Sequence, residues 1–219
     1  MHYSIQNLII IKKEINTKLN KLDINNPPNI IAVSKTFPIE SILPLIDYGH
    51  QHFGENKVQE AIEKWTNLKL KNKDIKLHLI GKLQRNKVKN AIEIFDFIHS
   101  VDNEKLAKKI SEEQIVQNKK IKIFIQVNIG QEEQKSGIKV DNLESFYLYC
   151  KKINLDIIGL MCIPPVTNDS EIYFSMMKNL NDKLNLSQLS MGMSEDYLKA
   201  TNHLSTYLRI GTAIFGKRD

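Results

Sequence analysis

The segment Asn29-Ile-Ile-Ala-Val-Ser-Lys35, followed directly by Thr36-Phe37-Pro38, decides the fold. Its β-branched residues predict a buried strand, and Pro38 predicts the first turn of a helix. The strand therefore carries Lys35 to its C-terminal end, where the chain turns. Burying an ammonium group is costly, whereas a partly desolvated lysine has a lowered pKa and can attack an aldehyde. A lone lysine in so lysine-rich a chain is more often solvent-facing, so an imine-forming role for Lys35 depends on matching residues elsewhere.

Strand-like and helix-like segments alternate along the whole chain. The predicted strands are 29–34, 51–54, 76–80, 96–100, 121–127, 155–160, 187–191 and 206–210. Helices are predicted between them and before the first strand, among them 4–22, 56–70 and 103–118, the last with Asp102 as its N-cap.

Eight strands that are each separated by a helix imply parallel βαβ units. We therefore predict an α/β protein with one domain, residues 1–219, folded as a single (β/α)8 TIM-type barrel after an N-terminal helix. The N-terminal helix is expected to cover the last helix position of the barrel. An open doubly wound sheet is the alternative, but no glycine-rich dinucleotide fingerprint follows the first strand.

The composition indicates an ordinary globular protein and restricts the cellular locations and the classes of partner that are expected. The net charge is +6, but the lysines are scattered without interleaved aromatic residues, so a solvated surface is favoured over a specific nucleic-acid site. The apolar stretch Leu8–Ile11 is too short for a membrane span and lacks a signal-peptide layout, which predicts a cytoplasmic protein. Cys150 and Cys162 are expected to be reduced, buried thiols, and no metal site is predicted.

The last two predicted strands carry residues suited to an anion. Arg209 lies inside an apolar strand that ends at Gly211 and Thr212, and the preceding strand supplies Ser190-Met-Gly-Met-Ser194. Within that segment, Gly192 allows close backbone approach, and the loops after strands seven and eight of a barrel commonly bind phosphate. Strands one and eight are neighbours in a closed barrel. A ligand with a phosphate and a nearby aldehyde therefore fits, namely pyridoxal 5′-phosphate (PLP), with Arg209 facing its pyridine nitrogen; a structural salt bridge is the alternative role for Arg209.

A set of motifs occurs in order along the chain and resembles one family. The motifs are Ile31-Ala-Val-Ser-Lys35, His52-Phe-Gly-Glu-Asn-Lys-Val-Gln-Glu60, His78-Leu-Ile-Gly-Lys-Leu-Gln-Arg-Asn-Lys87, Ser136-Gly137, Gly159-Leu-Met161, Leu189-Ser-Met-Gly-Met-Ser194 and Arg209-Ile-Gly-Thr-Ala-Ile-Phe-Gly216. Together they are similar to the pyridoxal phosphate homeostasis proteins, the YggS/proline synthetase co-transcribed family.

The resemblance implies an alanine-racemase-like barrel with PLP held as an internal aldimine, a Schiff base, on Lys35. It implies that Ser190, Gly211 and Thr212 hold the phosphate and that Arg209 meets the pyridine nitrogen. An arginine there would keep this nitrogen unprotonated and make the cofactor a weaker electron sink.

Further motif residues match positions around the cofactor ring. The resemblance implies that Asn56 and Met161 line the surroundings of the ring. His78 and Asn86 match motif residues near the site, and their roles stay open. Glu55, Glu60 and Glu63 are interpreted as charges on a helix surface.

The resemblance also implies a role in PLP (vitamin B6) and amino-acid homeostasis, as a carrier or buffer without turnover. A two-base racemase needs a second acid or base on the opposite face of its substrate, which relatives of this fold take from the tyrosine of an added β-domain in a dimer. Tyr48, Tyr173 and Tyr197 are local candidates, but each is better explained by packing or surface exposure.

Two alternatives stay open, namely a single-domain PLP-dependent amino-acid racemase that uses Lys35 and a nucleic-acid- or ribosome-associated module. The expected partners are PLP and PLP-dependent apo-enzymes, and the expected oligomeric state is a monomer.

Overall fold

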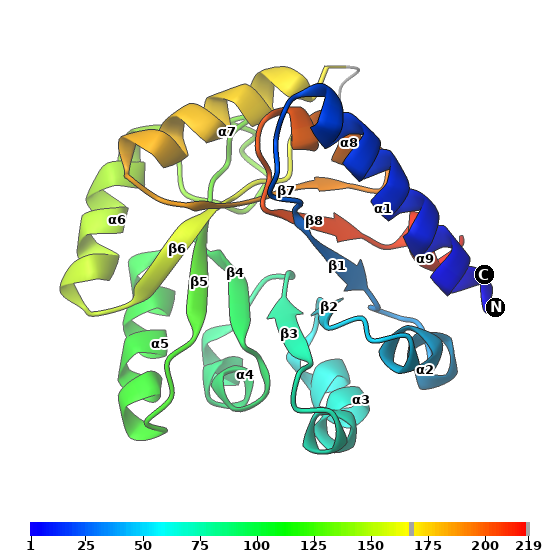
Figure 1. The fold of residues 1–219 in the computed structure, drawn as a ribbon. Coiled ribbons are helices and arrows are strands. Elements are labelled where there is room, and N and C mark those ends of the chain that lie inside the picture. The colour runs from blue at the N-terminus through cyan, green and yellow to red at the C-terminus, as the bar shows by residue number, and fades with distance from the viewer. Residues whose placement is uncertain (167–168, 218–219) are drawn as a thin grey trace.

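The computed structural model describes residues 1–166 and 169–217, and in this part of the chain eight parallel strands close into a barrel in sequence order (Figure 1). The strands are β1 (Asn29–Val33), β2 (His52–Glu55), β3 (Lys76–Leu79), β4 (Phe97–Val101), β5 (Lys122–Gln126), β6 (Asp156–Met161), β7 (Gln188–Met193) and β8 (Tyr207–Ile210). Strand β1 pairs with both β2 and β8, which closes the barrel. The predicted barrel is confirmed, and each predicted strand boundary lies within about two residues of the observed one.

Helices surround the barrel on its outside (Figure 1). They are α1 (Tyr3–Lys21), α2 (Ile39–Asp47), α3 (Val58–Lys71), α4 (Val88–Ile94), α5 (Glu104–Val116), α6 (Leu143–Lys152), α7 (Glu171–Lys183), α8 (Tyr197–Asn202) and α9 (Thr212–Phe215). Helix α1 packs alongside α8 and the short α9, where the side-chain amide of Asn7 donates to the carbonyl oxygen of Ile214 at 3.0 Å. The expectation that the first helix covers the last helix position is therefore confirmed.

The predicted starts of the helices differ from the observed ones by one or two residues, and at two of them the predicted role of a named residue is wrong. The N-cap of α5 is Asn103 and not Asp102, because the Asn103 side chain accepts the backbone N–H of Leu106 at 2.9 Å. The Asp102 carboxylate instead accepts the backbone N–H of Gly137 at 3.2 Å. Helix α2 begins at Ile39, so Pro38 is its N-cap residue and lies just before the first turn.

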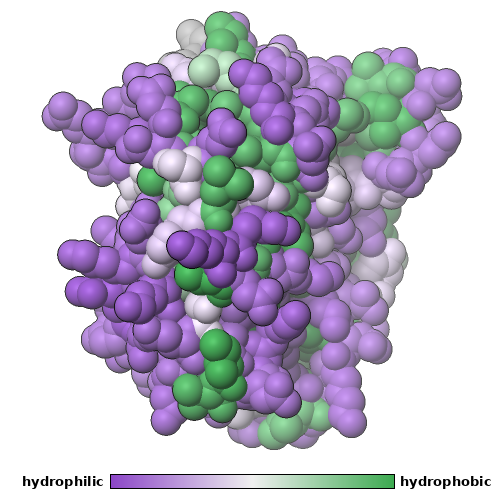
Figure 2. Space-filling model, turned by 90° about the vertical axis from the view of Figure 1, so that its left-hand side faces the viewer, coloured by the Kyte–Doolittle hydropathy of each residue, from purple (hydrophilic) through white to green (hydrophobic). Residues whose placement is uncertain are grey.

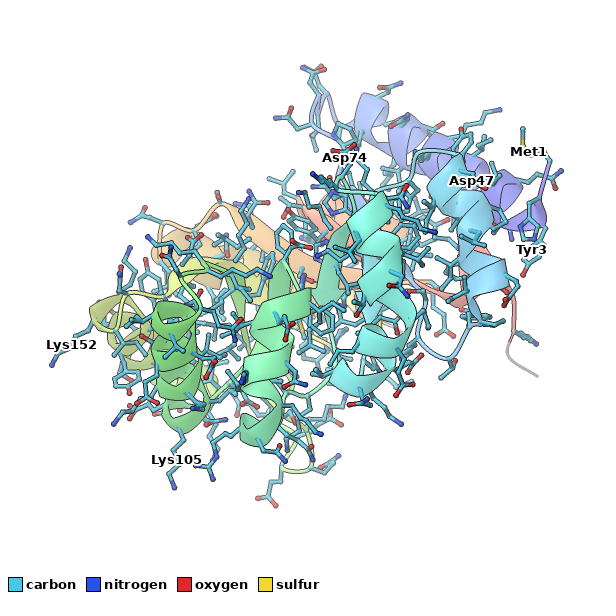
Figure 3. The ribbon with its side chains drawn as sticks, turned by 90° about the horizontal axis from the view of Figure 1, so that it is seen from below. Met1, Tyr3, Asp47, Asp74, Lys105 and Lys152 are labelled. Atoms are coloured by element: carbon cyan, nitrogen blue, oxygen red, sulfur yellow. The ribbon has the colours of Figure 1, made fainter. Side chains whose placement is uncertain are left out.

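The surface is mostly hydrophilic. Figure 2 shows one side of the molecule, on which hydrophobic groups occur in small separate clusters among polar side chains. Seen from below, charged side chains such as Lys105 and Lys152 point away from the barrel (Figure 3). Within the residues that the structure describes, no helix has the length and apolar character that a membrane crossing requires.

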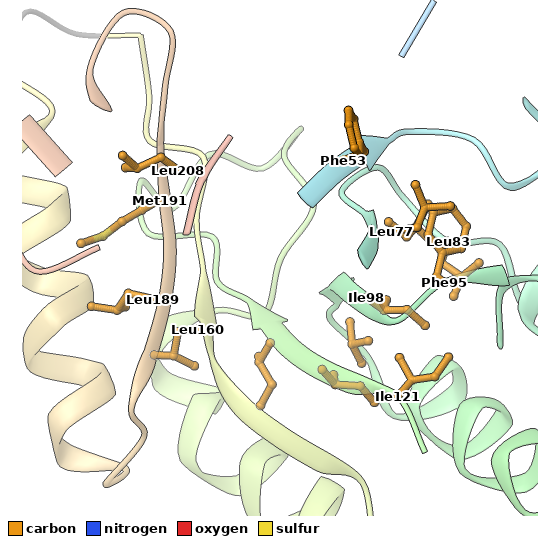
Figure 4. Close-up of a cluster of buried hydrophobic side chains, with 14 of the residues drawn as sticks. Phe53, Leu77, Leu83, Phe95, Ile98, Ile121, Leu160, Leu189, Met191 and Leu208 are labelled. Carbon is orange, nitrogen blue, oxygen red and sulfur yellow. The ribbon is translucent and has the colours of Figure 1, made fainter. Parts of the chain in front are cut away.

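The hydrophobic core has two parts, because successive residues of a strand point to opposite faces. Ile31 and Val33 of β1 point into the barrel and pack with Phe97, Phe124 and Tyr207. A larger shell lies between the strands and the helices; Figure 4 shows side chains of this shell, among them Phe53, Leu77 and Ile98. Each fully buried side chain of this size contributes about 1.5–3 kcal/mol to stability. Because the eight strands are parallel, their C-terminal ends lie at one rim of the barrel.

Candidate functional site

A cavity of about 630 Å³ lies at the C-terminal ends of the strands. Of the predicted site residues, Lys35, Asn56, Arg209, Gly211 and Thr212 line this cavity. Met161, Ser190 and Gly192 are buried within their strands and do not belong to the lining that the described residues form. The rim of the barrel therefore brings together residues from β1, β2 and β8 that are far apart in the sequence.

Lys35 is half-buried and lies two residues beyond Val33, the last residue of β1. The peptide groups on both sides of it are anchored. The Ser34 carbonyl oxygen accepts from Lys64 Nζ at 3.0 Å, and the Thr36 N–H donates to Glu60 Oε1 at 2.6 Å. Thr36 has φ 66°, a left-handed conformation that is unfavourable for a β-branched residue and persists only where the surroundings impose it. The turn that aims Lys35 is thus held by contacts from α3.

These anchors belong to a buried cluster of charges beside Lys35. Glu55 ends β2 and is fully buried, and its Oε1 accepts from Ser34 Oγ at 2.7 Å, Trp65 Nε1 at 2.9 Å and Lys64 Nζ at 3.0 Å. Burial raises the pKa of Glu55, against the opposing effects of Trp65 and Lys64. The interpretation of Glu55 as a helix-surface charge is wrong, because strand β2 continues through this residue into the core.

Glu60 and Glu63 both lie on α3, as predicted. Burial alone would raise the pKa of Glu60, but the Thr36 N–H and the Lys64 ammonium hold the pKa of this carboxyl below its usual range. Glu63 is exposed and accepts from the Gln59 side chain at 2.9 Å. Only Glu63 therefore behaves as a plain surface charge.

Arg209 is the cation at the inner end of the cavity. Its guanidinium is buried and donates from Nη1 to the Ser190 carbonyl oxygen at 2.6 Å and to Ser190 Oγ at 2.7 Å, and from Nη2 to the Cys162 carbonyl oxygen at 2.8 Å. Burial lowers the pKa of Arg209 from its usual value, but a guanidinium remains charged in proteins. The structure thus places the hydroxyl of Ser190 against Arg209, behind the cavity.

A second serine stands where an anion is expected. Ser194 Oγ accepts the backbone N–H groups of Gly211 and Ala213, each at 3.2 Å, and Ser194 lines the cavity. The motif 190–194 contained both serines, and position relative to the strand end distinguishes them, since Ser194 lies one residue beyond β7. Gly192 has φ 90°, and a Cβ there would lie 2.5 Å from the Cβ of Ala200, so this glycine is required by the packing of α8 on β7.

Asn56 is held by a close backbone contact. A Cβ at Gly81 would lie 2.4 Å from the Asn56 carbonyl oxygen, so only glycine lets these two segments approach. His78 is fully buried in β3, whereas Asn86 is exposed in the 3₁₀ turn Arg85–Lys87 and lies outside the lining of the cavity.

Polar residues that the sequence interpretation did not single out complete the cavity. Gln126 ends β5, Asn128 follows it closely, and Lys82 and Lys135 contribute ammonium groups to the lining. A signal for Gln126 and Asn128 was present, because polar residues at the C-terminal end of a barrel strand face the site in this fold.

Comparison with known proteins places the chain in a family. Residues 12–219 match the family model described as alanine racemase, N-terminal domain. The pyridoxal phosphate homeostasis protein of Aquifex aeolicus is 37% identical over 203 residues, which cover 88% of this chain and 88% of that protein. The chain belongs to the pyridoxal phosphate homeostasis protein family. The resemblance stated from the motifs is thereby confirmed.

Solved structures agree with this family assignment. PipY of Synechococcus elongatus PCC7942, in its structure with PLP bound, is similar at 33% identity and a TM-score of 0.80, covering 92% of this chain and all of that chain (100%). Alanine racemase of Corynebacterium glutamicum has a TM-score of 0.74 at 17% identity, and the match covers 99% of this chain and 61% of the racemase. The second likeness concerns the fold alone and confirms the predicted alanine-racemase-like barrel.

Proposed function

We propose that this member of the pyridoxal phosphate homeostasis protein family binds PLP covalently through Lys35 and acts as a carrier or buffer of PLP in the cytoplasm. One observation carries the proposal: Lys35, Arg209, Ser194, Gly211 and Thr212 line one cavity, in which Ser194 Oγ accepts the backbone N–H groups of Gly211 and Ala213. Its volume, about 630 Å³, lies in the range of about 300–1,000 Å³ that is usual for small-molecule sites.

The chemistry of the donor groups fits PLP. Lys35 would supply an amine for the aldehyde, and Arg209, which can only donate, would face the ring nitrogen and keep it unprotonated. Gly211, Thr212 and Ser194 supply N–H and hydroxyl groups for the phosphate, with the Ser194 oxygen already between two N–H groups as a phosphate oxygen would be. When bound, PLP supplies an electrophilic aldehyde and an electron-withdrawing ring.

The remaining predicted residues are assigned to the cofactor's surroundings. We propose that Asn56 contacts the ring from the rim, since it lines the cavity and is fixed by Gly81. Met161 packs in the interior of the barrel, Gly192 allows α8 to pack on β7, and Ser190 supports Arg209.

A carrier is favoured over an enzyme because of what the cavity contains. The lining formed by the described residues includes, besides Lys35, the ionisable residues Lys82, Lys135, Glu195 and Asp196, but it includes no tyrosine, which is the residue that racemases of this fold use as the second acid or base. The Tyr197 hydroxyl donates to the carboxylate of Glu14, and Tyr48 is exposed. Amino-acid racemisation by Lys35 remains the second candidate, and the racemase-type fold is the observation that favours it.

The first experiment tests attachment at Lys35. Wild type, Lys35→Ala and Lys82→Ala are incubated with PLP and their absorbance is recorded before and after borohydride. Lys82 is the matched control, because it is a second lysine of the same cavity. In wild type and Lys82→Ala we expect an aldimine band that borohydride removes by reducing the C=N bond to a secondary amine, which leaves the cofactor attached to the chain after denaturation. Lys35→Ala should show neither the band nor attached cofactor. A wild type that takes up no PLP, or an unaffected Lys35→Ala, would refute the proposal.

The second experiment separates carrier from racemase. Holo-protein is incubated in deuterium oxide with a panel of amino acids, and exchange at the α-carbon is measured; we expect none above the rate of free PLP. Transfer is tested in parallel by mixing the holo-protein with a PLP-dependent apo-enzyme, whose activity should return faster than with an equal amount of free PLP. Robust α-carbon exchange would instead support the racemase. Light scattering checks the expected monomer.

A further inference from the structure

Three histidines form a row of side-chain contacts through the interior of the barrel, and the row leads through Ser190 to Arg209. Nδ1 of His52 lies 2.9 Å from Nε2 of His78, and Nδ1 of His78 lies 2.9 Å from Nε2 of His99. Nδ1 of His99 lies 2.8 Å from Ser190 Oγ, which accepts from Arg209 Nη1 at 2.7 Å. We call His52, His78 and His99 the histidine chain. It crosses β2, β3 and β4 and joins them to β7 and β8.

The inner part of the histidine chain is buried away from solvent. His78 and His99 are fully buried, and their rings stack on Phe97 and Phe124 at centroid distances of 4.2 and 4.3 Å. Burial is the main reason that the pKa values of both histidines lie well below the usual value, so both rings are neutral. His52 lines a second cavity, of about 320 Å³, next to the start of β1 and β2. The histidine chain therefore runs from this second cavity, at the face of the barrel opposite the cavity of about 630 Å³, to Arg209.

The donors and acceptors of this chain have one consistent direction. Arg209 can only donate, so Ser190 Oγ must accept from it. The hydroxyl proton of Ser190 is then satisfied by Nδ1 of His99, which makes Nε2 of this neutral ring the donor to His78, and the same step repeats from His78 to His52. In the reverse direction His99 would also donate to Ser190, and the buried hydroxyl proton would lose this acceptor, which is unfavourable.

We propose that His52, His78 and His99 are positioning residues for Arg209, forming a directed hydrogen-bonded chain that keeps the Ser190 hydroxyl as an acceptor of the guanidinium. The inference rests on the proposed function, in which Arg209 faces the ring nitrogen of PLP. Held at Ser190 and at the Cys162 carbonyl oxygen, the guanidinium keeps one orientation before the ligand arrives. Such preorganisation favours binding because less freedom is lost.

The direction of the chain is tested on the cofactor-free protein. Histidines are labelled with ¹⁵N, assigned by single His→Phe variants, and their tautomers are determined from long-range ¹H–¹⁵N correlations at neutral pH. We expect His78 and His99 each to be a single tautomer with the proton on Nε2. The variant His203→Phe, outside the chain, is the control and should leave both signals unchanged. A proton on Nδ1 of His99, or averaged tautomers in either residue, would overturn the proposal.

The positioning of Arg209 is tested with two matched variants of one aromatic stack. His99→Phe keeps a ring beside Phe124 but breaks the chain, so the Ser190 hydroxyl turns away from Arg209. We expect the NMR signals of the Arg209 Nη groups to show faster rotation of the guanidinium. We also expect the absorbance maximum of bound PLP to shift and PLP to bind about tenfold more weakly. Phe124→Leu disturbs the same packing with the chain intact, and it should leave the Arg209 signals and the absorbance maximum as in wild type.

Unchanged Arg209 signals in His99→Phe, or equal effects of the two variants, would refute the positioning role. The guanidinium and histidine signals are recorded without cofactor, so they decide the inference even if wild type binds no PLP. That last outcome would instead refute the proposed function. If His99→Phe does not fold, the tautomers in wild type still decide the direction of the chain.

Discussion

Replacing Lys64 by Met tests the buried charge cluster that anchors the turn at Lys35. Lys64 Nζ lies 3.0 Å from Glu55 Oε1, from Glu60 Oε1 and from the Ser34 carbonyl oxygen. The side chain of Lys64 is only 9% exposed and that of Glu55 is fully buried. Met has a similar length and apolar stem, so the substitution removes the charge and leaves the Glu55 carboxylate in the core without a cation.

The expected loss is large. Removing one partner of a buried ion pair costs about 3–5 kcal/mol, and a protein of this size loses about 2–4 °C of melting temperature per kcal/mol. We therefore expect the Tm of Lys64→Met to fall by roughly 6–20 °C. Lys69→Met is the matched control on the same helix. Lys69 Nζ lies 2.6 Å from Asp96, but both side chains are partly exposed (21% and 28%), so about 1 kcal/mol or less is expected from that pair.

Urea unfolding at several pH values provides the assay. Burial raises the folded-state pKa of Glu55 above its unfolded value, so the stability linked to this group is fully present below the unfolded pKa and is lost as pH rises through the folded one. Lys64 lowers the folded-state pKa of Glu55, so removing Lys64 should raise this pKa further and increase the stability that is lost as the pH rises. Lys64→Met should therefore regain stability as the pH is lowered from 7 to about 5. The double variant Glu55→Gln with Lys64→Met should be more stable than Lys64→Met.

Equal losses for Lys64→Met and Lys69→Met, or no rescue by Glu55→Gln, would refute the reasoning. PLP uptake by Lys64→Met should also weaken, because the turn at Lys35 loses its anchor at Ser34.

Three further predictions concern single positions. Burial raises the pKa of the Cys150 and Cys162 thiols to about 12, so iodoacetamide at pH 8 should label them only after denaturation, and rapid labelling of the folded chain would contradict this. Gly81→Ala should push Asn56 out of place, since the new Cβ would lie 2.4 Å from the Asn56 carbonyl oxygen; a PLP titration should show several-fold weaker binding, and unchanged binding would count against the assignment of Asn56. Gly159→Ala would place a methyl group 1.9 Å from a carbonyl oxygen of β7, so circular dichroism should show loss of folded protein, and a variant with wild-type Tm would show that the strands can separate without cost.

The local pattern of apolar, polar and glycine residues was sufficient to predict the barrel and part of the candidate site. Apolar β-branched runs that end in glycine or polar residues identify strands, and their regular alternation with helices leaves few topologies. Lys35, Arg209, Gly211 and Thr212 were identified for the same reason, because a residue at the C-terminal end of a barrel strand lies at the site wherever that strand stands in the ring.

The roles of other residues were not predicted, because the groups that surround them come from distant parts of the chain. Glu55 has the composition of a surface residue, and only the approach of Lys64 and Trp65 from α3 makes its burial possible. Ser190 and Ser194 are equivalent by composition, but Ser190 lies inside β7 and contacts Arg209, whereas Ser194 lies just beyond the end of β7, after a shift in its register with β8, and lines the cavity.

Strand order, barrel class and the place of Lys35 thus follow from the sequence alone, because backbone conformation and side-chain alternation are local properties. The histidine chain does not, since its members bond to residues 26, 21 and 91 positions away. Such bonds exist only once the barrel has closed, because closure aligns side chains of different strands in its interior and removes the water that would otherwise satisfy them.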